Sequence, residues 1–175
     1  MPEESVYIPD RLKRLKGLDA ESIVKEIFGY LRNELEGAYY YGGGQFLDYS
    51  AESLQIVDKN NIIEDAKNYP DWDIRYCLAM VCAQEGSYFG EVILRNLGGK
   101  WKYCGELRFF LYKVLINLGF PFDPSVGIVL RKCGIDLDGR FIPVIRIAKL
   151  RLRKNKRVKS LHEVYEKIRT TGDWK

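Results

Sequence analysis

The sequence has a single histidine, His162, among its 175 residues. Histidine is the commonest general base and the commonest protein ligand for transition metals, so its scarcity argues against zinc chemistry and against most histidine-dependent catalysis. A Ser-His-Asp or Cys-His arrangement would have to use His162, and no nucleophile motif lies near it. We therefore predict no catalytic residue, no metal and no cofactor, which favours a protein that is not an enzyme.

Two further absences concern cysteine pairs and long hydrophobic runs. The four cysteines, Cys77, Cys82, Cys104 and Cys133, include no CxxC pair, so we expect reduced and mostly buried thiols. No apolar run reaches the length of a membrane span. Residues 1–4, Met-Pro-Glu-Glu, are acidic where a signal peptide would be basic. These features predict a cytoplasmic protein that does not contact membranes.

The composition predicts one folded domain. Hydrophobic residues make up 46% of the chain and aromatic residues 13%, which argues against disorder. The length suits a single domain with a substantial core. We predict an irregular N-terminal arm over residues 1–17 and an α+β domain over residues 18–172. In this domain, helices pack around a small antiparallel sheet and one central buried helix.

The central helix is predicted from Trp72 to Leu97. An apolar stripe with helical spacing runs along it and comprises Leu78, Val81, Cys82, Tyr88, Phe89, Val92 and Ile93. Small residues beside the stripe, Ala79, Ala83, Gly86 and Gly90, predict close contact with a second element. Ser87, Glu91 and Arg95 are placed on the solvent side, the last two as an ion pair. Gly98 or Gly99 ends the helix, and a strand follows over residues 100–103.

Other elements follow from start and stop signals. A helix over residues 20–36 is expected to end at Gly37, and a second is expected over residues 51–66 with Ser50 as its cap. A hairpin is expected to join residues 100–103 to residues 107–112. Near the C-terminus we predict a helix from Asp123 that ends at Gly134, an element over residues 144–154 that we favour as a helix, and a last helix opened by a Ser160–Glu163 capping box.

Two polar residues, Glu85 and Asn96, interrupt the apolar stripe and form a candidate buried polar site. A buried carboxylate must be neutral, paired with a cation or lining a pocket, because burying a bare charge is too costly. A partnered structural carboxylate is one reading of Glu85. A carboxylate-based hydrolase that uses Glu85 is the alternative.

Residues 39–41 are three consecutive tyrosines, Tyr39, Tyr40 and Tyr41, followed by three glycines. The glycines lack the lysine and hydroxyl of a P-loop and the spacing of a dinucleotide-binding motif. The pattern predicts a tyrosine-rich loop that either has no specific role or forms the lip of a binding surface. Asp136, Asp138 and Gly139 suggest part of a calcium loop, but the remaining ligands are missing, so we interpret them as a tight turn.

The charge of the chain is strongly segregated. From Gly139 to His162 there is no acidic residue, and the tract from Arg140 to Lys159 carries +9. Because the net charge is +4 and residues 163–175 are neutral overall, residues 1–138 carry −5. The candidate binding residues in this tract are Arg146, Lys149, Arg153, Lys156 and Arg157. The tract either binds a nucleic acid or another anionic partner, or it contacts the acidic surface of the protein itself.

Three motifs resemble a family of small bacterial proteins of unknown function. They are Asp-Tyr-Ser-Ala-Glu-Ser-Leu at residues 48–54, Gly-Ser-Tyr-Phe-Gly-Glu at residues 86–91 and Gly-Gly-Lys-Trp at residues 98–101. Pro143 and the Ser-Leu-His-Glu-Val-Tyr stretch at residues 160–165 are also similar to that family. The resemblance spans residues 48–165 and carries no known activity, and the basic tract and the three tyrosines lie outside it.

The leading hypothesis is a non-enzymatic protein-interaction or regulatory module, similar in role to an immunity protein. It is suggested by the lack of catalytic motifs, the segregated charge and the surplus of tyrosine. A protein partner or self-association is expected. Nucleic-acid binding through the tract from Arg140 to Lys159 is the second hypothesis, and the Glu85 hydrolase is the third.

Overall fold

The structure is a computed structural model that describes residues 28–29, 31–39, 45–59, 74–104 and 132–175. Residues 28–29 and 31–39, which we call the N-terminal helical segment, are helical and precede the named elements. These are α3 (Ser53–Asp58), α5 (Ile74–Leu97), β1 (Lys100–Tyr103), β2 (Cys133–Leu137), β3 (Arg140–Ile142), α8 (Val144–Leu152) and α9 (Leu161–Thr171). Helices and one antiparallel sheet confirm the predicted α+β class. The expected arm over residues 1–17 lies outside the described residues.

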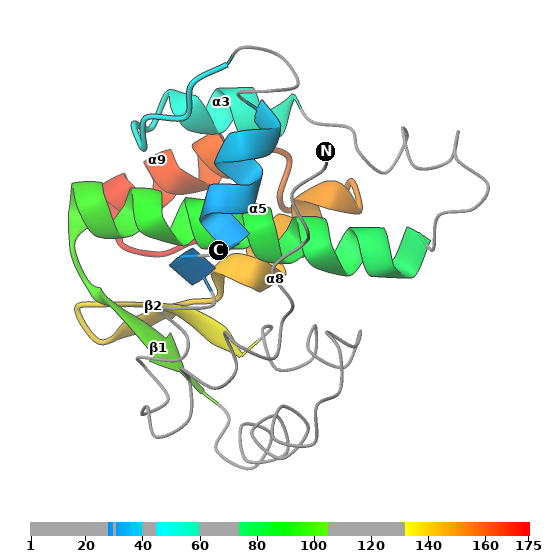
Figure 1. Cartoon of the computed structure of the whole chain (residues 1–175). Helices are drawn as coiled ribbons and strands as arrows, with labels where there is room; N and C mark the ends of the chain where they lie inside the picture. Colours follow the sequence, from blue (N-terminus) through cyan, green and yellow to red (C-terminus); the bar gives the residue numbers. More distant parts are fainter. Residues whose placement is uncertain (1–27, 30, 40–44, 60–73, 105–131) are drawn as a thin grey trace, which may run out of the picture.

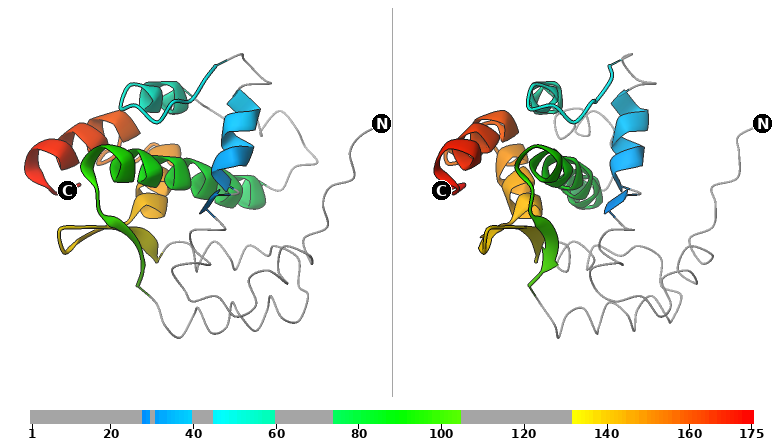
Figure 2. Two further views of the ribbon diagram at one scale, coloured as in Figure 1. Left: turned by 60° about the vertical axis from the view of Figure 1, so that its left-hand side comes forward. Right: turned by 90° about the vertical axis from the view of Figure 1, so that its left-hand side faces the viewer.

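Helix α5 occupies the centre of the molecule. It contacts α8, α9 and β2. The three-stranded sheet lies on one side of it, α3 on the opposite side, and the N-terminal helical segment crosses it on a further side (Figures 1 and 2). Within the described residues, no helix is long and apolar enough to cross a membrane.

The apolar stripe of α5 is buried as predicted, because its residues recur on the side that faces the other elements. Tyr88, Phe89, Val92 and Ile93 have no exposed surface. The helix ends at Gly98, whose φ is +86° and whose N–H donates to the carbonyl oxygen of Leu94 at 3.1 Å. Ser87 corrects the prediction of a solvent-facing side chain. It is fully buried, and its hydroxyl donates to the carbonyl oxygen of Gln84 at 2.7 Å, which satisfies the group inside the protein.

Two glycines of α5 allow neighbouring elements to come close. A Cβ atom on Gly86 would lie 2.8 Å from the Cα of Ile145 in α8. A Cβ atom on Gly90 would overlap the indole ring of Trp101 in β1. The predicted contact of this flank with a second element is confirmed, and the partners are a helix at Gly86 and a strand at Gly90.

The sheet has the order β1-β2-β3, and both pairings are antiparallel. Strands β2 and β3 are joined by Asp138 and Gly139, with φ of +50° and +80°, so the predicted tight turn is confirmed as a two-residue hairpin. Gly134 does not end a helix as predicted. It lies inside β2, where a side chain would meet the carbonyl oxygen of Ile142. The strand expected over residues 107–112 lies outside the described residues, and the partner of β1 that the structure shows is β2.

The C-terminal helices follow their predicted signals. Helix α8 begins after Pro143 and buries Ile145, Ala148 and Leu152, as expected. Ser160 is confirmed as the N-cap of α9, because its hydroxyl accepts a hydrogen bond from the backbone N–H of Glu163 at 3.1 Å.

The start and stop residues in the N-terminal part of the chain predicted the helix bounds less well than those near the C-terminus. The helix expected to end at Gly37 continues to Tyr39, so Tyr39 is helical and half-buried and is not part of a loop. Glycine tolerates helical φ and ψ angles, so by itself it does not end a helix. Helix α3 covers Ser53–Asp58, and the Ser50 hydroxyl accepts a hydrogen bond from the N–H of Ser53 at 3.1 Å. Residues 51–52 and 59 of the predicted second helix form turns, whereas residues 60–66 and the helix start at Asp123 lie outside the described residues.

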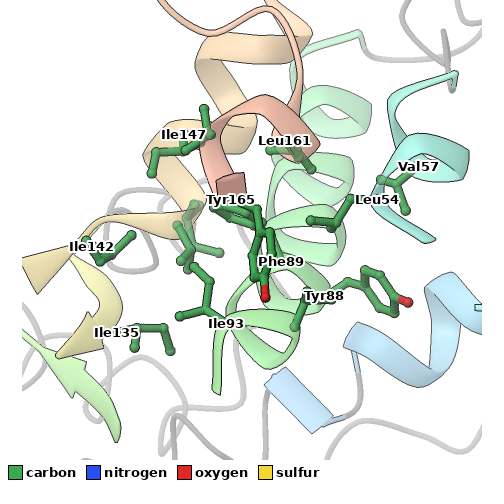
Figure 3. Close-up of a cluster of buried hydrophobic side chains, with 14 of the residues drawn as sticks. Leu54, Val57, Tyr88, Phe89, Ile93, Ile135, Ile142, Ile147, Leu161 and Tyr165 are labelled. Carbon is green, nitrogen blue, oxygen red and sulfur yellow. The ribbon is translucent and has the colours of Figure 1, made fainter. Parts of the chain in front are cut away.

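The core joins all these elements around α5. Side chains from α3, α5, α8, α9 and the sheet converge there, including Leu54, Phe89, Ile93, Ile135, Ile147 and Leu161, none of which has exposed surface (Figure 3). Burying side chains of this size contributes roughly 1.5–3 kcal/mol each before the entropy cost of ordering them. The candidate residues on and beside α8 are therefore held on a packed scaffold.

Candidate binding surface

Most cations of the basic tract lie on the surface. Two residues of the candidate set are exposed at α8: Arg146 lies within the helix, and Arg153 follows it directly. Lys156 and Arg157 are exposed in the connection between α8 and α9, whereas Lys149 is half-buried. We call residues 153–159 the basic loop. Five of its seven residues are Lys or Arg, and all five are exposed.

The basic loop has a defined backbone. The N–H of Asn155 donates to the carbonyl oxygen of Leu150 at 3.0 Å, and the N–H of Val158 donates to the carbonyl oxygen of Asn155 at 3.0 Å. The Asn155 side chain accepts a hydrogen bond from the N–H of Arg157 at 3.0 Å. Val158 is 1% exposed and anchors the loop in the core. Lys154 adopts a φ of +53°, a conformation typical of tight turns.

Several of these cations have no carboxylate partner in the part of the chain that the structure describes. None of the ion pairs among the described residues includes Arg146, Arg153, Lys156, Arg157 or Lys159. Arg140 is used internally, because its Nη1 donates to the carbonyl oxygen of Thr171 at 3.0 Å. Within the described ranges, these five residues therefore form no ion pair with the protein's own carboxylates.

One cation of the tract, Arg151, turns inward instead. Its Nη2 atom lies 2.5 Å from both carboxylate oxygens of Glu85. Glu85 is completely buried, and Arg151 is 7% exposed. Burial raises the pKa of Glu85 to about 8, while the nearby guanidinium opposes the rise. The structure thus places Glu85 in a partnered structural role, the first of its two predicted readings.

Arg151 was missed among the predicted site residues. The available signal was its position in α8, four residues after Ile147 and three after Ala148, both of which have no exposed surface. Because other cations precede and follow Arg151 in the sequence, this signal of a buried position is easily overlooked.

Asn96 does not belong to a buried polar site with Glu85. It is exposed near the end of α5, where the stripe reaches the surface. Its amide donates to the carbonyl oxygens of Tyr49 at 2.9 Å and Val92 at 2.8 Å. Asn96 and Glu85 thus lie in different regions of the molecule, and the prediction that Asn96 is a buried polar residue is wrong.

Asn96 belongs to a cluster around Tyr49. The backbone of Tyr49 has a φ of +64°, and its N–H donates to the hydroxyl oxygen of Tyr88 at 2.9 Å. The Tyr49 hydroxyl donates to Glu36, and the guanidinium of Arg95 lies 3.6 Å from the centre of the Tyr49 ring. Burial and the Glu36 carboxylate raise the pKa of Tyr49 to about 12. These contacts attach residues 45–50 to α5, and the phenol stays protonated at neutral pH.

Of the three consecutive tyrosines, the structure describes only Tyr39, which is helical. Its hydroxyl lies 3.4 Å from the carbonyl oxygen of Val57, which ties the N-terminal helical segment to α3. Tyr40 and Tyr41 lie outside the described residues, so their predicted role as a binding lip stays a prediction. Within the described ranges, no group of three or more His, Cys, Asp or Glu side chains is arranged to hold a metal ion.

No family model, no curated protein and no solved structure matches this chain. Function must therefore be inferred from its own residues.

Proposed function

We propose that this protein is a non-enzymatic interaction module that binds an acidic surface of a partner protein through the basic loop and the exposed face of α8. The observation that carries this proposal is the concentration of exposed cations on a loop with a defined backbone. Five of the seven residues 153–159 are cationic and exposed, and Val158 holds the loop against the core.

Such a loop is unfavourable in the free protein. Like charges close in sequence repel one another, and a loop fixed by backbone hydrogen bonds cannot spread them apart. A partner that supplies carboxylates relieves this repulsion. Charge complementarity of this kind accelerates association and selects the partner more than it adds affinity.

The tract is better suited to a protein than to a nucleic acid. Residues 143–163 contain no Phe, Tyr or Trp, so the tract offers no ring on which bases of a single strand could stack. An acidic segment of a protein needs no such ring.

A regulatory, immunity-like role in the cytoplasm is part of the same proposal, as is membership of the bacterial family that the three motifs resemble. The three motifs also contact one another, so they form one packed unit of this chain. Tyr49 of the first motif stacks on Tyr88 of the second, with ring centres 4.9 Å apart. Trp101 of the third motif packs against Gly90 of the second.

The hydrolase alternative has no support from this geometry. Glu85 has no exposed surface, and both of its oxygens are engaged by Arg151. A buried and paired carboxylate of this kind argues against the hydrolase alternative.

The proposal is tested with a triple variant of the basic loop, Lys156→Gln, Arg157→Gln and Lys159→Gln. The matched control, Lys100→Gln, Lys167→Gln and Lys175→Gln, removes the same charge from exposed positions elsewhere. Binding of a fluorescent oligoglutamate peptide, a short DNA duplex and a single strand is measured at several salt concentrations. Tagged proteins are also used to capture partners from the native lysate.

We expect the wild-type protein and the control to bind the acidic peptide and to retain the same protein in stoichiometric amount. The loop variant should lose both. If the wild-type protein binds either nucleic-acid probe more tightly than the peptide, nucleic-acid binding replaces the proposal. The same conclusion follows if the captured material absorbs at 260 nm and nuclease treatment abolishes this absorbance. Equal binding by loop variant and control would show that the basic loop is not the surface.

A further inference from the structure

Both ends of the basic loop are attached to one residue of α3, Asp58. Before the loop, Nη1 of Arg151 donates to the backbone carbonyl oxygen of Asp58 at 3.1 Å. After the loop, the N–H of Leu161 donates to Oδ1 of Asp58 at 2.8 Å, and the Ser160 hydroxyl donates to Oδ2 at 2.7 Å. The N–H of His162 also donates to Oδ2, at 3.1 Å. Asp58 thus closes the loop.

This attachment is strong because it joins several elements inside the protein. Arg151 is simultaneously held by the buried Glu85 of α5. The carboxylate of Asp58 accepts two of the backbone N–H groups that α9 leaves without intrahelical partners, which is a favourable site for an anion. Asp58 therefore fixes the start of α9 through its carboxylate. It holds the end of α8 through its backbone carbonyl oxygen and through an ion pair between its Oδ1 and Nε of Arg151, at 3.8 Å.

Asp58 bears on the loop in two opposing ways. Its negative charge lies beside a surface that is proposed to bind carboxylates, and by charge alone it weakens that binding. Its hydrogen bonds hold the loop in one conformation, and a surface ordered in advance binds more tightly because less conformational entropy is lost on association. The two effects predict opposite outcomes when the charge is removed.

We propose that Asp58 is the positioning residue of the basic loop and that the order it imposes outweighs its unfavourable charge. This inference rests on the proposed function only where peptide binding is measured, because the order of the loop can be measured without a ligand. Asp58→Asn keeps the size of the side chain, but it removes the charge and leaves one oxygen in place of two to accept the hydrogen bonds from Ser160, Leu161 and His162.

The experiment compares Asp58→Asn with Asp136→Asn. Asp136 pairs with Lys102 at 2.7 Å on the sheet, so the control changes the net charge equally at a site outside the basic loop. Two readouts are taken, binding of the oligoglutamate peptide and hydrogen exchange of the backbone amides of residues 153–159. Val57→Ala, which creates a cavity in α3 beside Asp58, controls for general loss of stability.

We expect the Asp58→Asn variant to bind the peptide roughly tenfold more weakly than the wild-type protein. Hydrogen exchange of its loop amides should also be faster. Asp136→Asn and Val57→Ala should show smaller changes in both readouts. Tighter binding by Asp58→Asn would mean that charge dominates and would overturn the proposal. Unchanged exchange of the loop amides would do the same. If the wild-type protein does not bind the peptide, the proposed function fails, and the exchange readout still decides whether Asp58 orders the loop.

Discussion

Arg151 and Glu85 face one another in the core, with Nη2 of the arginine 2.5 Å from each oxygen of the carboxylate. The pair joins α8 to α5 across 66 positions of sequence. The Arg151 side chain is 6% exposed and that of Glu85 is not exposed at all, so neither group can recover its hydration if the other is removed. Breaking such a pair costs far more than removing a surface charge.

Arg151→Met should lower the free energy of unfolding by about 3 kcal/mol, because it leaves the buried Glu85 and the carbonyl oxygen of Asp58 without their donor. Arg153→Met, two positions away and exposed, should change it by less than about 0.5 kcal/mol. Chemical denaturation of both variants provides the comparison. If both substitutions lower the free energy of unfolding equally, the buried pair does not stabilise the protein more than an exposed arginine does.

The pKa of Glu85 predicts a pH dependence of stability. The folded protein raises this pKa from 4.5 to about 8, so between these values the folded state binds more protons than the unfolded state. The contribution of Glu85 is therefore fully present below pH 4.5 and is lost as the pH rises through about 8.

Glu85→Gln should remove this slope, because the amide has similar volume and does not titrate. Unfolding free energies measured at about pH 5 and about pH 8 give the slope for each protein. Glu91→Gln, on the outer side of α5, should retain it because Glu85 is intact. A slope that persists in Glu85→Gln would assign it to other groups.

Gly90→Ala should destabilise the protein by about 1–3 kcal/mol, because the added methyl group overlaps the ring of Trp101 inside the core. Gly37→Ala provides the opposite case. Gly37 is helical and has no atom within 4 Å of an added Cβ, so alanine should stabilise the protein by about 0.5–1 kcal/mol. Thermal unfolding of both variants tests the pair, and destabilisation by Gly37→Ala would contradict the helical continuation to Tyr39.

Ser160→Ala should reduce the free energy of unfolding by about 1–2 kcal/mol, since it removes the cap of α9 and one hydrogen bond to Asp58. Thr170→Ala in the last turn of α9 removes an exposed hydroxyl and should have an effect below about 0.5 kcal/mol. Urea denaturation distinguishes them. A small effect at Ser160 would indicate that Asp58 alone holds the start of α9.

Local signals predicted the elements well where the structure describes them. Gly98 ends α5, Pro143 precedes α8, and Ser160 caps α9, because each of these depends on residues within about four positions. Gly134 and Gly37 were misinterpreted for one common reason. Glycine also occurs where a backbone or side chain must approach closely, or where a helix simply tolerates it, and neither circumstance is visible in the neighbouring sequence.

The sequence by itself determined the α+β class, the buried stripe of α5 and the segregation of positive charge, since composition and periodicity carry this information directly. Only the tertiary structure decided that Arg151 turns inward to Glu85 while its neighbours stay exposed, and that Asp58 holds the start of α9 from 103 positions away. Such contacts arise when packing brings distant elements together, because a buried polar group is stable only beside whichever partner the fold places next to it.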